Sequence, residues 1–202
     1  GYRSPRAGRS ILWRLVVDVS MHRGLSLAEI EAEEGAKATY FLYPRSIFYN
    51  LLSTEIHRLV ERILSLGHEI ALHFDPTHFR EALNEDALIA AIDEERDLLH
   101  REFGVAPTAV SFHLYGVLEQ PMPEDDELAG LVNAYSKRLR QDYGYASDSN
   151  GIWLYRRLRD VLAEAREEHL QVLTHPEWWT RDVMAPRVRP PQSLVGRRAC
   201  AA

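Results

Sequence analysis

Short apolar segments alternate along this chain with segments of helical periodicity, and this alternation constrains the fold more than any other feature. The apolar segments are rich in β-branched and aromatic residues, which is typical of strands buried on both faces of a sheet. The predicted strands are residues 11–18, 38–43, 68–73, 108–113, 143–148 and 171–175. The predicted helices are residues 25–34, 54–66, 82–103 and 154–169. Repeated strand–helix units predict a parallel sheet covered by helices, either an open doubly wound sheet or a barrel.

A titratable side chain closes five of the predicted strands. These residues are Asp18, His73, His113, Asp148 and His175. In parallel sheets of either kind, functional groups collect where the strands end and the loops to the helices begin. The sequence therefore predicts one polar site at the carboxyl edge of the sheet.

Three of the polar residues suit a divalent metal ion, most plausibly zinc. Asp18, His73 and His78 offer one carboxylate and two imidazoles, and three protein ligands leave a position open for water. Such a site makes hydrolysis of an amide or ester accessible. Asp75 is the substitute if His78 is not a ligand. The alternative is that His73 is a hydrogen-bonded structural residue and His78 a surface residue.

The segment that follows the last predicted strand suggests a proton donor and a pocket wall. His175 precedes Pro176, which holds its ring close to the end of the sheet, and a histidine there can protonate a leaving amine. Trp178 and Trp179 are candidates for the wall of a sugar-sized pocket. The alternatives are a structural histidine and two packing residues.

Composition narrows the class of protein. Seven arginines lie near the two ends, and without them the net charge of −6 becomes −13, which disfavours nucleic-acid binding. These arginines are Arg3, Arg6, Arg9, Arg187, Arg189, Arg197 and Arg198. No apolar run approaches the ~20 residues of a membrane span. The single cysteine, Cys200, cannot form an internal disulfide and fits a reducing compartment.

Six segments, in this order, resemble the polysaccharide deacetylase superfamily (NodB homology, carbohydrate esterase 4). They are RLVVDVS, GAKATYFL, GHEIALHFD, VSFH, SDSNGIW and QVLTHPEWW. The chain looks most like the intracellular deacetylase-like branch found with surface-glycan biosynthesis. The resemblance covers residues 11–180, with residues 1–10 and 186–202 as expected flexible tails. It implies a distorted (β/α) barrel of about seven strands, a bound metal ion, an N-acetylated sugar or glycan precursor as the substrate, and a cytoplasmic location. The oligomeric state stays open.

The resemblance also implies roles for individual residues. Asp18 and His73 match metal ligands of the family, and His175 matches the catalytic acid. Asp148 falls where the family places an aspartate that supports the catalytic groups. His113 falls at a motif that contributes substrate-binding and supporting residues.

The chain departs from the family pattern at the first and second motifs. Val16 stands where relatives carry the aspartate that acts as general base, and Leu15 where a histidine is common. The usual spacing would put the second metal histidine at Thr77, one residue before His78. Loss of a general base costs ~10²–10⁴ in rate. Two functions follow: a metal-dependent deacetylase in which Asp75 or Asp148 replaces the base, or an impaired homologue that binds glycan or regulates glycan assembly. A hydrolase with another substrate is a third, weaker reading.

Overall fold

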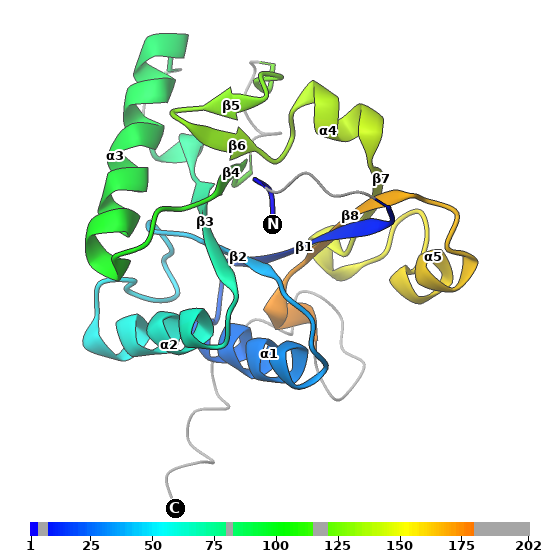
Figure 1. The fold of residues 1–202 in the computed structure, drawn as a ribbon. Coiled ribbons are helices and arrows are strands. Elements are labelled where there is room, and N and C mark those ends of the chain that lie inside the picture. Colours follow the sequence, from blue (N-terminus) through cyan, green and yellow to red (C-terminus); the bar gives the residue numbers. More distant parts are fainter. Residues whose placement is uncertain (4–7, 80–82, 115–120, 180–202) are drawn as a thin grey trace, which may run out of the picture.

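The computed structural model describes residues 1–3, 8–79, 83–114 and 121–179. Strands and helices alternate over most of this length, as the sequence predicts (Figure 1). The strands are β1 (Ser10–Val17), β2 (Thr39–Leu42), β3 (Glu69–Phe74), β4 (Ala109–Phe112), β5 (Glu127–Leu128), β6 (Leu131–Asn133), β7 (Gly144–Ser147) and β8 (His169–Thr174). The α-helices are α1 (Met21–Glu33), α2 (Thr54–Ser65), α3 (Glu85–Phe103), α4 (Lys137–Asp142) and α5 (Leu158–Glu164). Short 3₁₀ turns are η1 (Pro76–His78), η3 (Ser149–Gly151) and η4 (Pro176–Trp178).

All eight strands form one curled sheet in the order β5-β6-β4-β3-β2-β1-β8-β7. Every pairing is parallel except that of β5 with β6. Because β1 pairs with both β2 and β8, strands from the two ends of the fold lie side by side in the sheet. The prediction of a distorted (β/α) barrel is confirmed, with eight strands in place of about seven.

The two faces of the sheet bury different apolar sets. The outer face packs under α1, α2 and α3, through residues such as Leu15 and Val17 of β1. The inner face gathers a smaller cluster, in which Leu12 and Val16 of the same strand meet Phe41 and Leu173. Successive side chains of a strand point to opposite faces, so each central strand serves both clusters. This double burial explains the continuously apolar strands of the sequence.

Several predicted boundaries differ from the structure: α1 begins four residues earlier than predicted, and the last helix is much shorter than predicted. The helix expected over residues 154–169 is confined to α5, which ends where Ala165 adopts a left-handed backbone (φ 45°), and β8 already begins at His169. The sequence analysis did not predict α4 or the β5–β6 hairpin. That hairpin turns through Ala129 and Gly130, both with positive φ, and its strands are too short to show an alternating pattern.

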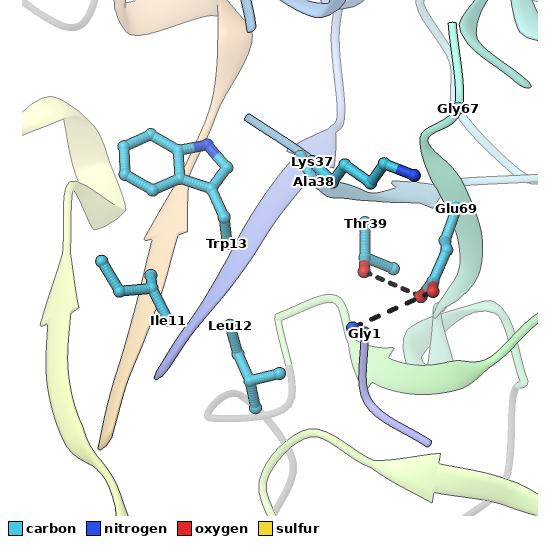
Figure 2. Close-up of a pocket in the computed structure, with 9 residues that line it drawn as sticks. All are labelled: Gly1, Ile11, Leu12, Trp13, Lys37, Ala38, Thr39, Gly67 and Glu69. Carbon is cyan, nitrogen blue, oxygen red and sulfur yellow. Dashed lines mark hydrogen bonds and ion pairs between the residues drawn. The ribbon is translucent and has the colours of Figure 1, made fainter. Parts of the chain in front are cut away.

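The amino end of the barrel is closed by the start of the chain. Tyr2 lies edge-on against Phe41 and donates a hydrogen bond of 2.7 Å to Gln171 Oε1. Figure 2 shows Gly1 beside Glu69, in a pocket of about 230 Å³ at this end. The predicted tail 186–202 lies outside the described residues. In the described part of the chain, no helix is long and apolar enough to cross a membrane.

Candidate active site

The structure brings Asp18, His73 and His113 together, and we refer to these three residues as the strand-end cluster. His73 Nε2 lies 3.3 Å from Asp18 Oδ1 and 3.3 Å from His113 Nδ1. The distance from His113 Nδ1 to Asp18 Oδ1 is 3.6 Å. One nitrogen or oxygen of each residue lies within 4.8 Å of the other two, so the three residues could hold a metal ion.

The fold produces this cluster from the ends of three strands of one sheet. Asp18 follows β1, His73 lies near the end of β3, and His113 follows β4, so all three occupy carboxyl ends of parallel strands. Ser111 Oγ hydrogen-bonds to His73 Nδ1 at 2.7 Å, which directs Nε2 toward Asp18. The ring of Tyr43 stacks on His113 with centroids 4.5 Å apart. Two of the three side chains are thus oriented by contacts outside the cluster.

The electrostatics of the cluster favour a bound cation. Burial lowers the pKa of His73 to about 3, so its imidazole is neutral at neutral pH and keeps a lone pair. Burial acts to raise the pKa of Asp18, but the neighbouring His73 and His113 outweigh it and lower the value to about 2. Asp18 Oδ1 is buried and has no hydrogen-bond partner among the described residues. A buried anionic oxygen that faces two imidazoles, of which that of His73 is neutral, fits a divalent metal ion.

A second polar pair lies at the ends of β7 and β8. His175 Nδ1 and Asp148 Oδ1 are 2.7 Å apart, and Asp148 Oδ2 accepts a bond of 3.2 Å from the backbone N–H of His175. Burial acts to lower the pKa of His175, but the hydrogen bond and charge of Asp148 outweigh it and raise the pKa. This pair is near enough for His175 to act electrostatically on Asp18. A histidine that is fixed at Nδ1 and whose pKa is raised is suited to proton donation.

Other predicted site residues lie outside the strand-end cluster. His78 is exposed in η1, where its ring meets Phe79, and the second imidazole beside Asp18 belongs to His113. Trp178 is half-buried, with its ring 6.4 Å from that of His175, and Trp179 is 43% exposed.

The predicted replacements for the missing base are already engaged. Val16 is buried in the inner apolar cluster. Asp75 accepts hydrogen bonds from the hydroxyls of Tyr43 (2.6 Å) and Thr77 (2.6 Å), and these bonds lower its pKa although burial acts to raise it. Asp148 uses both oxygens to hold His175. Asp75, with its lowered pKa, is therefore a weak proton acceptor, and Asp148 has no oxygen that is not already bonded to His175.

Two buried groups near the site were not predicted from the sequence. Glu177 is 2% exposed, and burial raises its pKa to about 8, against the effect of His175. Arg14 lies inside the barrel and donates through Nη2 to the hydroxyls of Tyr135 (3.1 Å) and Tyr145 (3.3 Å). The available signal for Arg14 was a charge in the middle of an apolar strand, ILWRLVV.

Comparison with known proteins gives a consistent result at the level of the fold. No family model and no curated protein matches the sequence. The peptidoglycan deacetylase PdaC from Bacillus subtilis superposes with a TM-score of 0.56 at 15% identity, over 92% of this chain and 84% of that one. The polysaccharide deacetylase Bc1974 from Bacillus cereus gives 0.56 at 15% identity, over 93% and 86%. The chain has the fold of the CE4 polysaccharide deacetylases.

This fold also includes relatives without activity. A mutant of BA3943, described as a CE4 family pseudoenzyme with restored enzymatic activity, superposes with a TM-score of 0.52 at 13% identity. That match covers 94% of this chain and 62% of the BA3943 chain. The CE4 fold alone therefore does not distinguish an active site from an inactive one. That distinction depends on the residues that this chain places at the site.

Proposed function

We propose that this protein is a metal-dependent, deacetylase-like hydrolase that removes an acetyl group from an N-acetylated sugar or glycan precursor, and that Val16 makes it slow. The observation that carries the proposal is the strand-end cluster with the His175–Asp148 pair beside it. The strand-end cluster is suited to binding a cation, and the His175–Asp148 pair is suited to proton donation. Amide hydrolysis needs both of these elements. The single cysteine supports a cytoplasmic location.

Asp18, His73 and His113 are the residues that would hold the metal ion. Two imidazoles and one carboxylate suit zinc and leave a coordination position for the substrate side. An ion bound there polarises a carbonyl group and lowers the pKa of water. We infer that His113 completes the ligand set in place of His78, because only His113 has a ligand atom within reach of Asp18 and His73 among the described residues.

His175 supplies the proton that the leaving group needs. When water adds to the acetamide carbon and the carbon–nitrogen bond breaks, the sugar nitrogen leaves as an amine and must gain a proton. Asp148 holds Nδ1 of His175, so that Nε2 is the atom that donates it. The other proton transfer, from the attacking water, lacks a free carboxylate, since Val16 is apolar and Asp75 and Asp148 are engaged.

The second candidate is a catalytically impaired homologue that binds glycan or regulates glycan assembly. Val16 favours it, because the residue lies on the strand that leads to Asp18 and cannot accept a proton. The BA3943 pseudoenzyme is a precedent for such a loss within the same fold. The two candidates share the metal site and differ only in turnover.

Metal content is the first test. Protein purified without chelator should contain about one divalent ion per chain, and His73→Ala should lose it. Asn50→Ala is a matched control, since Asn50 is an exposed residue outside the site. A wild-type protein that stays metal-free after zinc is supplied would contradict both candidates as metal-binding proteins.

Restoring a carboxylate at position 16 separates the two candidates. Val16→Asp should raise kcat on an N-acetylated sugar by ~10² or more, because a general base contributes ~10²–10⁴. The new carboxylate would lie on the same strand face as Arg14, whose Nε and Nη1 have no partner among the described residues. Turnover by the wild type marks the slow hydrolase, and turnover by the variant alone marks the impaired homologue. A wild type that is active and unchanged by the substitution would show that another residue is the base.

A further inference from the structure

A groove of about 1070 Å³ lies between α1 and α5, on the outer side of the sheet. Figure 1 shows these two helices set apart along β1 and β8. All four tryptophans of the chain line this groove: Trp13, Trp153, Trp178 and Trp179. They come from β1, from the loop after η3 and from η4, so three separate segments contribute indole rings to one surface.

The rest of the lining is mainly aliphatic. α1 contributes Leu27 and Ile30, and α5 contributes Leu158 and Leu162. Ile30 is 54% exposed and Leu162 is 42% exposed, whereas Leu158 of the same lining is buried. An exposed, concave apolar surface of this size is typical of a binding site rather than of ordinary solvent-facing surface.

The polar residues of the groove lie at two places. Asp148, at the end of β7, is the residue that holds Nδ1 of His175, so the groove reaches the partner of the proposed proton donor. Arg157 and Arg159 flank the start of α5. Arg159 pairs with Asp160 at 3.2 Å, whereas Arg157 has no ion pair within the described ranges. The groove is therefore mainly apolar. At the start of α5 it carries the positive charge of Arg157, which no described carboxylate neutralises.

We propose that this groove binds the aliphatic chain of a lipid-linked glycan phosphate, with the phosphate near Arg157 and the sugar toward Asp148 and His175. The inference rests on the proposed function and specifies its substrate class. A guanidinium group is well suited to phosphate, and indole and leucine side chains are suited to a hydrocarbon chain. A free oligosaccharide fits less well, because its hydroxyls need hydrogen-bonding groups along the groove and the lining from Trp13 to Leu162 is apolar.

The tryptophans make the groove directly observable. Because the chain has no other indole, its intrinsic tryptophan fluorescence reports on this groove alone. Titration with farnesyl phosphate should give a saturable change in emission. Farnesol should bind at least tenfold more weakly, because it lacks the charge that Arg157 recognises. Inorganic phosphate and N,N′-diacetylchitobiose should give no saturable change at the same concentrations.

Variants assign the response to the groove. Leu162→Glu places a charge in the apolar part and should weaken farnesyl phosphate binding at least tenfold, and Arg157→Glu should remove the advantage of farnesyl phosphate over farnesol. Val105→Glu is the matched control, since Val105 is 38% exposed and lies away from the groove, and it should bind like the wild type. His73→Ala should also keep full binding, so that failure of the metal site and failure of the groove are distinguishable.

Three results would overturn the inference. One is the absence of a saturable response to farnesyl phosphate in the wild type. Another is chitobiose binding as tight as that of farnesyl phosphate, which would make the groove a sugar site. The third is a tryptophan emission that changes with protein concentration in the absence of ligand, but no longer does so in Leu162→Glu. That result would make the groove an interface between two copies of the chain.

Discussion

The same barrel contains two buried polar clusters of different kinds. The strand-end cluster combines one carboxylate with two imidazoles at the edge of the sheet, where Asp18 is 20% exposed. The second, which we call the Arg14 cluster, places Arg14 among the hydroxyls of Tyr2, Tyr135 and Tyr145 in the barrel interior, and no carboxylate of the described residues pairs with it. In the first cluster an anionic carboxylate faces the imidazole of His73, which is neutral at neutral pH, and Asp18 Oδ1 has no hydrogen-bond partner among the described residues. In the second a cation is enclosed by neutral dipoles and aromatic rings.

We expect the two clusters to contribute differently to the free energy of folding. A buried charge without an opposite charge is expensive, whereas a cluster prepared for a cation is stabilised as soon as the cation binds. We therefore expect substitutions in the strand-end cluster to act mainly on metal affinity. Substitutions in the Arg14 cluster should act mainly on the free energy of unfolding. The following experiments can break this division or sharpen it.

The largest expected effect is on metal affinity at the third ligand. His113→Ala should weaken zinc binding by about a thousandfold, because it removes one of three protein ligands, an effect larger than the 10–100-fold loss typical of residues behind the ligands. His78→Ala is the matched control and should bind like the wild type, because His78 is exposed and outside the cluster. Competition with a chelator measures both affinities. The reverse result would assign the ligand role to His78.

The next largest expected effect is on the free energy of unfolding and concerns Glu177, a buried carboxyl that lies near the carboxylates of Asp18 and Asp148. Burial raises its pKa to about 8 from 4.5, and the carboxylates of Asp18 and Asp148 also oppose its ionisation while His175 favours it. Between pH 4.5 and 8 the folded state keeps a proton that the unfolded state has released. Stability therefore falls as pH rises through this window. Glu177→Gln should raise the free energy of unfolding by up to about 3 kcal/mol at pH 7.

Unfolding of the Glu177→Gln variant by urea, at several pH values, measures this effect. The wild type should lose stability from pH 5 to pH 8, and the variant should show a flatter profile over the same range. Glu164→Gln serves as control, since Glu164 is exposed and pairs with Arg156. Parallel profiles for wild type and Glu177→Gln would mean that Glu177 is ionised in the folded protein.

In the Arg14 cluster, Arg14→Met should raise the free energy of unfolding by about 1–3 kcal/mol. Methionine has a similar volume and removes a buried charge for which no carboxylate compensates, although it also removes the contacts with Phe41 and Tyr135. Unfolding in the presence of chelator measures the change without a metal contribution. Zinc affinity should stay within a few-fold of the wild type. A loss of stability would show that the phenols and rings compensate the guanidinium fully.

The sequence predicted the two clusters to very different extents. The strand-end residues were predictable because a strand boundary is visible where an apolar run meets a charge, and carboxyl ends of parallel strands share one edge. The geometry of the loops after β3 and β4 determines which second imidazole lies beside Asp18. Residue spacing along the chain carries no information about that geometry. His113 was therefore expected near the substrate and His78 at the metal.

The interior cluster was beyond the reach of sequence patterns for a related reason. Arg14 and Tyr145 lie on strands that are not consecutive in the chain, and Tyr135 lies in a loop after a three-residue strand. Their meeting depends on how strongly the sheet curls, which apolar periodicity does not encode. The same holds for the groove between α1 and α5: the prediction extended the helix over residues 154–169, whereas α5 spans only Leu158–Glu164.

The smallest predicted effect tests whether the strand-end cluster is oriented by its surroundings. Ser111 is fully buried and bonds to His73 Nδ1 at 2.7 Å, so Ser111→Ala should let the imidazole rotate and weaken zinc binding about tenfold. Tyr135→Phe is the matched control, because it also removes one hydroxyl from a barrel hydrogen bond but belongs to the Arg14 cluster. It should leave zinc affinity unchanged. Equal losses in both variants would mean that the two clusters are coupled through the barrel interior, and the division between them would then fail.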